Sequence, residues 1–260
     1  MITARDILLT VLLPGFVSLL LLFTTALRKK EWLHGAAVLS SFALAGYWWR
    51  HPAWSDGPLE RLLFAGALLA LAFVAGRRAA GHRVLVPLVT FVLVVYVCWP
   101  VLRLEQAWAG AIAIVLSVLA AFAFRLLPSE DRPFLGVLLC LEMLAAEAVL
   151  LMLSGSIALS QLVGCLAASV GGVLVYTAVR RPAAIHPSVA AAAAPLAGSF
   201  LAAGLLYADL PLVSAILFAA APFFLMLSRR RAPQLILSPL ILLLPLALAV
   251  TFAAFRYVAE

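Results

Sequence analysis

Residues Phe134–Leu153 read FLGVLLCLEMLAAEAVLLML, an apolar run in which only two side chains carry charge. An α-helix rises about 1.5 Å per residue, so about 20 residues cross the roughly 30 Å hydrocarbon core of a bilayer. The two charged residues, Glu142 and Glu147, both fall well inside the run. The stretch therefore predicts a transmembrane helix that carries two carboxyl groups in the hydrocarbon region.

The rest of the chain repeats this pattern. Apolar residues make up 66% of the 260 residues and charged residues 11%, against about 45–50% and about 25% in a soluble domain. We predict an all-α, polytopic membrane bundle of about ten transmembrane helices, with residues 1–260 as a single transmembrane domain and no soluble domain. Charged or turn-rich breaks separate the expected helices, which are 7–27, 33–49, 59–76, 84–102, 106–126, 134–153, 157–179, 188–207, 211–228 and 235–256.

The distribution of basic residues predicts the orientation of these helices. Alternate connections hold clusters of two or three Lys and Arg, and the opposite side holds only five of the 18: Arg5, Arg50, Arg61, Arg103 and Arg256. Because basic loops stay in the cytoplasm, both termini are expected outside. Arg far outnumbers Lys and Ala and Leu are abundant, which favours a GC-rich bacterial genome and a location in the inner (plasma) membrane. The break between Tyr207 and Pro211 is the weakest point of this map.

Ten helices could form two halves, 1–128 and 129–260, of five helices each. An odd number of spans per half forces the halves into opposite orientations, the inverted-repeat plan of many secondary transporters. Pro87-Leu88-Val89-Thr90 and Pro211-Leu212-Val213-Ser214 occupy similar places five helices apart. The sequence therefore raises a 5+5 inverted repeat as one possible arrangement.

Glu142 and Glu147 are the candidate binding residues for a substrate or a proton. At 1.5 Å per residue they lie about 12 Å and about 20 Å from the cytoplasmic end of their helix. Acidic residues at such depth are costly, and they often mark proton or ion pathways. No Lys or Arg falls in the middle of any expected span to pair with them, so burial favours the neutral, protonated form.

A structural role for the two glutamates is the alternative. Five residues apart, they point about 140° away from each other and face different neighbours. On the next helix Gln161 is expected level with Glu147, and Ser169 level with Glu142; these are the possible supporting residues, and their hydrogen bonds would make each glutamate a link between helices. The same helix carries Gly164, Ala168 and Gly172, a small-residue stripe that predicts close helix packing.

Other chemistries lack their signatures. Cys98, Cys140 and Cys165 all lie in apolar runs with no CxxC pair, so neither a disulfide framework nor a zinc site is indicated. The histidines lie at loops or helix ends, and no HExxH motif is present. The basic residues form short clusters rather than the continuous face that nucleic acid requires. We expect no catalytic residues, no cofactor, no metal and no nucleic-acid partner.

Three functions remain open. The first is a small secondary transporter or flippase with a proton- or cation-responsive carboxylate in the Phe134–Leu153 helix. The second is a non-catalytic membrane subunit or assembly partner of a larger complex, with protein partners or a homo-oligomer in the lipid bilayer. The third, an intramembrane enzyme, is the least favoured because no nucleophile–base pair or metal-binding constellation is visible in the sequence.

Overall fold

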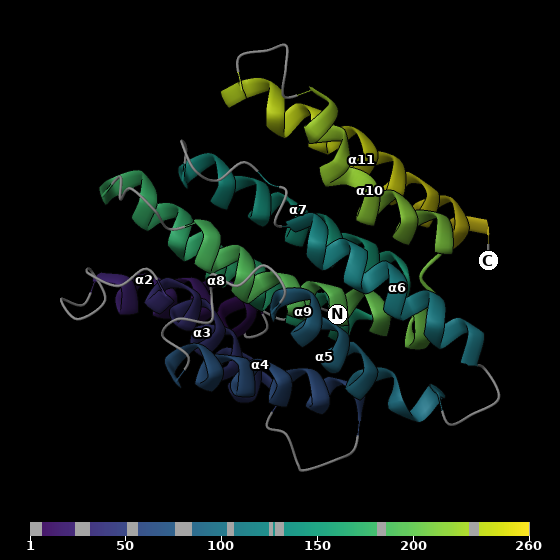
Figure 1. Cartoon of the computed structure of the whole chain (residues 1–260), viewed down its shortest axis with the longest axis horizontal. Coiled ribbons are helices and arrows are strands. Elements are labelled where there is room, and N and C mark those ends of the chain that lie inside the picture. The colour runs from purple at the N-terminus through teal and green to yellow at the C-terminus, as the bar shows by residue number, and fades with distance from the viewer. Residues whose placement is uncertain are drawn as a thin grey trace.

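The structure is a computed structural model that describes residues 7–23, 32–50, 57–75, 85–102, 107–124, 127, 133–180, 186–228 and 234–259. These residues form helices and short connections (Figure 1). In chain order the helices are η1 (Leu8–Leu12), α2 (Leu13–Phe23), α3 (Trp32–Arg50), α4 (Pro58–Ala75), α5 (Leu85–Leu102), α6 (Ala107–Phe124), α7 (Pro133–Leu153), α8 (Ile157–Arg180), α9 (His186–Tyr207), α10 (Leu212–Ser228) and α11 (Gln234–Ala259).

The all-helical prediction is confirmed for the described part of the chain, and the helix boundaries differ from the expected ones by a few residues at most wherever both can be compared. Four segments are long and apolar enough to cross a membrane: Phe134–Leu153, Ile157–Arg180, Ser188–Tyr207 and Ser238–Val258. Four further apolar helices are shorter: Leu8–Phe23, Leu88–Leu102, Trp108–Phe124 and Leu212–Leu225. Most of the basic connections that predict the orientation lie outside the described residues.

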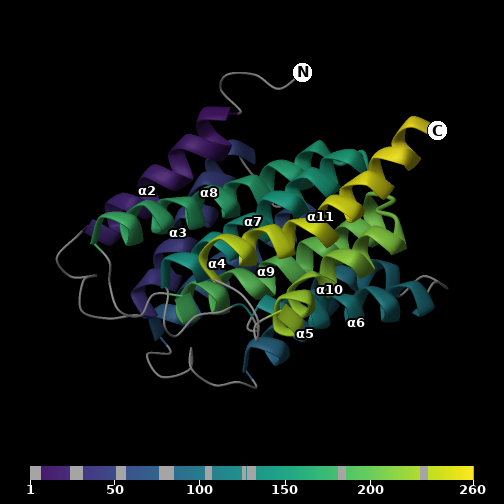
Figure 2. The same ribbon diagram turned by 90° about the horizontal axis from the view of Figure 1, so that it is seen from above.

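Helix α9 is the centre of the bundle. It packs against α3, α4, α5, α6, α7, α8 and α10, and every described side chain from Ser188 to Gly204 is buried. The sequence explains this position, because the run Ala190–Ala194 and the glycines Gly198 and Gly204 let neighbouring backbones approach closely. The helices α2, α8, α7 and α11 follow one another along one side of the bundle (Figure 2).

Two sharp turns set the neighbours of the longest helices. Between α7 and α8, Gly155 has φ +87° and Ser156 N–H donates to the Leu151 carbonyl. Between α9 and α10, Asp209 has φ +49°, and the N–H groups of Ala208 and Leu210 both donate to the Gly204 carbonyl. In the first turn Gly155 N–H also donates to the Met152 carbonyl, which completes a Schellman-type helix end. The second turn ends α9, so the chain does break between Tyr207 and Pro211 as the sequence predicts.

The small-residue stripe of α8 packs against α2. A Cβ added to Gly172 would overlap the carbonyl oxygen of Gly15, and one added to Gly15 would lie 3.1 Å from the carbonyl oxygen of Ala168. A Cβ added to Gly164 would meet nothing within 4 Å. The predicted packing role therefore holds for Ala168 and Gly172, and Gly164 takes no part in this close approach.

The packing does not follow the twofold relation of a 5+5 inverted repeat. Such a repeat would make α4 and α9 equivalent, yet α9 is central, whereas α4 packs on α3, α9 and α5. The matching sequences have a local explanation. Pro87 lies in the first turn of α5 and Pro211 directly precedes α10, and proline is common at helix starts because its fixed φ suits the first turn.

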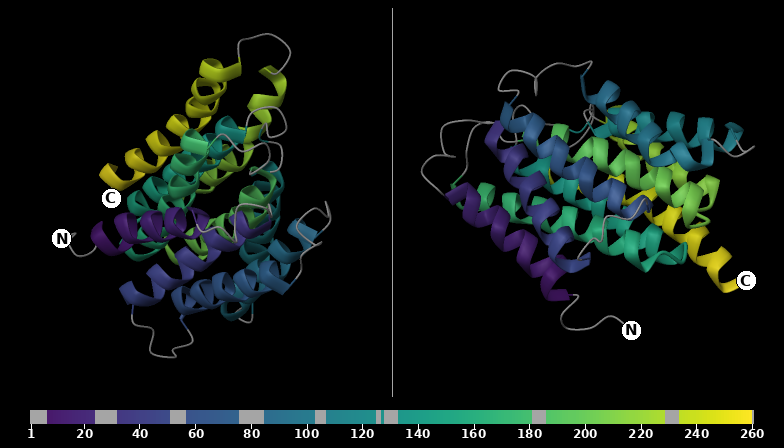
Figure 3. Two further views of the ribbon diagram at one scale, coloured as in Figure 1. Left: turned by 90° about the vertical axis from the view of Figure 1, so that its left-hand side faces the viewer. Right: turned by 90° about the horizontal axis from the view of Figure 1, so that it is seen from below.

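The two ends of the described chain lie on the same side of the bundle. The start of η1 and the end of α11 point the same way in both views of Figure 3. A chain that crosses a bundle an even number of times ends on the side where it began.

Candidate functional site

Helix α7 has a buried face and an exposed strip. Its exposed residues are Phe134, Ala145, Val149 and Met152. Successive residues of an α-helix turn by about 100°, which places these four within an arc of about 60°. Glu147 lies on the opposite, buried face and is 1% exposed. The predicted angle of about 140° therefore separates an inward-facing Glu147 from a Glu142 on the other side of the helix.

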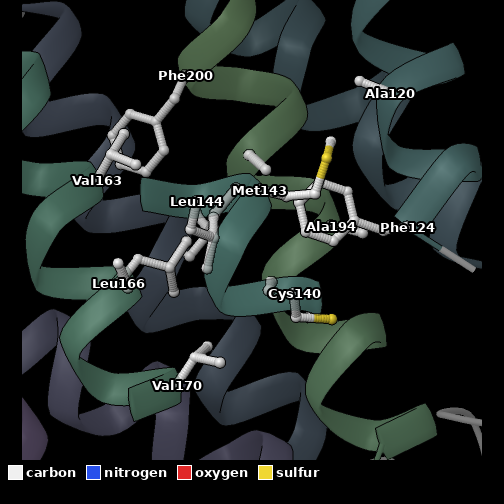
Figure 4. Close-up of a cluster of buried hydrophobic side chains, with 14 of the residues drawn as sticks. Ala120, Phe124, Cys140, Met143, Leu144, Val163, Leu166, Val170, Ala194 and Phe200 are labelled. Atoms are coloured by element: carbon white, nitrogen blue, oxygen red, sulfur yellow. The ribbon is translucent and has the colours of Figure 1, made fainter. Parts of the chain in front are cut away.

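Glu147 is enclosed in apolar side chains of its own helix. Met143 and Leu144 lie one turn before it, and Leu150 and Leu151 one turn after it, and all four are fully buried. Figure 4 shows the adjoining part of this core. There the α7 side chains lie between Val163 and Leu166 of α8 and Phe124 of α6. Phe200 of α9 lies beside Val163, and all of these residues belong to one continuous hydrophobic cluster that also includes Ala194.

The Glu147 carboxyl makes no hydrogen bond in the described part of the structure. Neither Oε1 nor Oε2 has a partner, and both atoms are buried. The expected bond from Gln161 is therefore not formed. A buried polar group without a partner costs about 1–3 kcal/mol, and a charged one costs more. The site can hold the neutral acid at this cost, whereas the carboxylate requires water or a cation.

Glu142 occupies a different environment. Its side chain is half-buried, and its angular position borders the exposed strip of α7. Its Oε2 atom is buried without a hydrogen-bond partner among the described residues. Ser169, the expected partner, is buried, and its hydroxyl donates to the Cys165 carbonyl of its own helix at 2.8 Å. The two glutamates are thus not brought together, and neither bond expected of Gln161 and Ser169 involves the buried oxygens.

No counter-charge faces either carboxyl from the helices packed on α7. These helices are α8, α9, α10 and α11. Within their described ranges the only Lys, Arg, Asp or Glu residues are Arg180 and Arg256. Arg180 is the last residue of α8, and Arg256 lies in the last turn of α11. Both are therefore at helix ends, far in sequence from the middle of a span.

Two further features were not found from the sequence. Ser117 of α6 and Ser18 of α2 are fully buried, and their hydroxyl oxygens lack hydrogen-bond partners in the described residues. Both lie at close helix contacts. A Cβ added to Gly198 of α9 would lie 2.8 Å from the Ser117 carbonyl oxygen, and one added to Gly172 would lie 3.1 Å from Ser18 Cβ. The sequence shows where the small residues are, but it does not show which of them lie at the same helix contact.

An arginine clamp joins α4 and α5. Pro100 has no N–H, so it cannot donate to the Tyr96 carbonyl one turn earlier. Arg61 Nη1 donates to that carbonyl at 3.1 Å instead, and its guanidinium carbon lies 5.4 Å from the centre of the Tyr96 ring. Tyr207 of α9 donates to the neighbouring Val97 carbonyl at 3.0 Å. The combination of Pro100 with a distant Arg61 gave no recognisable sequence signal.

The described residues contain no group of three His, Cys, Asp or Glu side chains that could hold a metal ion. Cys98, Cys140 and Cys165 are all buried free thiols. Comparison of the chain with protein-family models and with curated proteins gave no match. The two carboxyl groups of α7 are therefore the candidate functional groups of the described chain.

Proposed function

We propose that this protein is a multi-pass integral membrane protein with about ten transmembrane helices. Its exterior supports this proposal, because large apolar side chains are exposed on most of the outer helices, among them Phe16 at 63%, Leu244 at 65%, Phe255 at 73% and Val258 at 83%. Soluble monomers rarely expose apolar patches of such extent. In keeping with the charge distribution, we place it in a bacterial inner membrane with both termini outside.

Within the membrane we propose a small secondary transporter or flippase in which Glu147 binds and releases a proton or cation, with Glu142 as a second responsive group. The single observation that carries this proposal is the burial of Glu147 without any hydrogen-bond partner. In the closed arrangement the carboxyl is neutral. Loss of its proton to water requires the buried face of α7 to open, so protonation and conformation are coupled.

The neighbours of α7 supply points at which such an opening can occur. Interior prolines lie in three of the four helices that pack on α7: Pro195 in α9, Pro222 in α10, and Pro239 and Pro245 in α11. A proline removes one backbone hydrogen bond and favours a bend.

The test is reconstitution in liposomes with two probes. Proton movement is followed with an entrapped pH-sensitive dye under an imposed potassium diffusion potential, and lipid movement with a fluorescent short-chain phospholipid. We expect wild-type protein to accelerate at least one of these movements, Glu147→Gln to abolish the effect, and Glu142→Gln to reduce it. Wild-type protein that moves neither probe, or a fully active Glu147→Gln variant, would contradict the transport proposal.

A non-catalytic membrane subunit is the second candidate, and a specific observation favours it. The half-buried Glu142 borders the outer strip of α7 rather than the interior, where a group from another chain can reach it. If purified protein transports neither probe but copurifies with a stoichiometric membrane partner, this second function replaces the first.

A further inference from the structure

Glu142 is half-buried at the edge of the exposed strip of α7. Glu142 is the tenth residue of α7, which runs from Pro133 to Leu153, so it lies near mid-span. Helix α7 lies between α8 and α11 in Figures 1 and 2. Its Ala145 and Val149 side chains are exposed, so they contact none of the helices packed on α7 closely. In a bilayer this strip meets lipid tails, and the Glu142 carboxyl lies at its edge.

Nothing within the described chain compensates this carboxyl. Its Oε2 atom is buried without a hydrogen-bond partner among the described residues, and the hydroxyl of Ser169 donates to the Cys165 carbonyl. The rest of this half-buried side chain is what an approaching helix can reach. The cations on the helices around α7, Arg180 and Arg256, are at helix ends. A half-exposed carboxyl at mid-span is unfavourable against lipid tails, and a basic group on another chain would compensate it where the described residues do not.

The chemistry of the site selects the complementary group. Lipid headgroups lie about 15 Å away at the bilayer surface. A second copy of this chain docked through the same strip would bring one Glu142 to another and supply no cation within the described spans. In membranes, buried carboxyls pair with Lys or Arg side chains. The small exposed residue Ala145, close to Glu142 on the strip, also lets a foreign helix approach closely.

We propose that the outer strip of α7 around Glu142 is a docking surface for a partner transmembrane helix that carries a lysine or arginine near the middle of its span. The inference rests on the membrane-spanning part of the proposed function and is independent of transport. The contact between Glu142 and the basic residue sets the depth and the rotation of the partner helix beside α7. The apolar residues of the strip supply the rest of the contact surface.

The experiment uses a synthetic transmembrane peptide of leucine and alanine with one lysine at its centre, labelled with an acceptor dye. Full-length protein carrying a donor dye is reconstituted in vesicles of a neutral phospholipid, and association is measured by energy transfer. Two control peptides carry leucine in place of the lysine, or the lysine near one end. We expect the central lysine to strengthen association about five- to thirtyfold over the leucine control.

Matched variants of the protein locate the effect. Glu142→Gln is expected to lower binding of the central-lysine peptide to the level of the leucine peptide, whereas Glu147→Gln, altered on the buried face, leaves binding unchanged. Equal binding of all three peptides would overturn the proposal, as would undiminished binding to Glu142→Gln. Transfer between donor- and acceptor-labelled copies of the protein that is lost in Glu142→Gln would also overturn it, in favour of a dimer. Because no transport is measured, failure here leaves the transport proposal standing.

Discussion

Replacing Glu147 with methionine is expected to stabilise the protein while abolishing its activity. Methionine has a similar length and no hydrogen-bonding group that must be satisfied, and it suits the surrounding apolar side chains. Both carboxyl oxygens of Glu147 are buried without partners. Removing a buried unsatisfied polar group raises the free energy of unfolding by about 1–3 kcal/mol. For a chain of this size each kcal/mol raises the melting temperature by about 2–4 °C, so a rise of about 2–12 °C is expected.

Three variants make this test specific. Glu147→Gln keeps polar atoms without partners and is expected to gain little. Leu150→Met, on the same buried face of α7, controls for the insertion of methionine and is expected to cost less than about 1.5 kcal/mol. Apparent melting is followed in detergent by the loss of monodisperse protein on heating. If Glu147→Met melts below wild type while Leu150→Met does not, Glu147 makes a stabilising bond and the reasoning fails.

Three further substitutions test the helix contacts. Gly172→Ala is expected to lower the unfolding free energy by about 1–3 kcal/mol through overpacking. The control Gly171→Ala is expected to be neutral or slightly stabilising, because its Cβ would meet nothing within 4 Å. Equal melting temperatures of the two variants would refute the close α2–α8 contact. Gly198→Ala is expected to destabilise by a similar amount, because its Cβ would lie 2.8 Å from the Ser117 carbonyl oxygen, and unchanged melting would contradict this packing. Arg61→Ala is expected to cost about 1 kcal/mol by leaving the α5 carbonyl without its donor, and Arg61→Lys should recover part of that loss; a silent Arg61→Ala would show that the clamp contributes nothing.

The helices could be predicted because their signal is local. Long apolar runs separated by charged and turn-forming residues set each boundary, and Asp209 and Gly155 mark the two sharpest turns. The angular separation of Glu142 and Glu147 also follows from helix geometry alone. The sequence could not show which of the two faces inward, because the apolar residues of α7 surround the whole helix and leave no polar face to orient it.

The contacts between helices could not be predicted from the sequence. Gln161 and Ser169 were placed level with the glutamates by counting residues, but depth does not determine the direction of a side chain. A serine in an apolar helix also has a competing local acceptor, and Ser169 bonds to its own helix in this way. The central place of α9 could not be predicted from its small residues, because many membrane helices share that composition.

The most direct test of the central claim asks whether the buried face of α7 opens when Glu147 loses its proton. Cys140 lies two turns from Glu147 on the same face and is fully buried, so it serves as a natural reporter once Cys98 and Cys165 are replaced by alanine. Its labelling by a membrane-impermeant maleimide is measured in proteoliposomes from acidic to alkaline buffer, relative to the same protein with Glu147→Gln, which corrects for thiol ionisation. We predict that the protein with Glu147 labels increasingly faster than Glu147→Gln as pH rises; equal rates at every pH would mean that Glu147 is a permanently sealed structural residue.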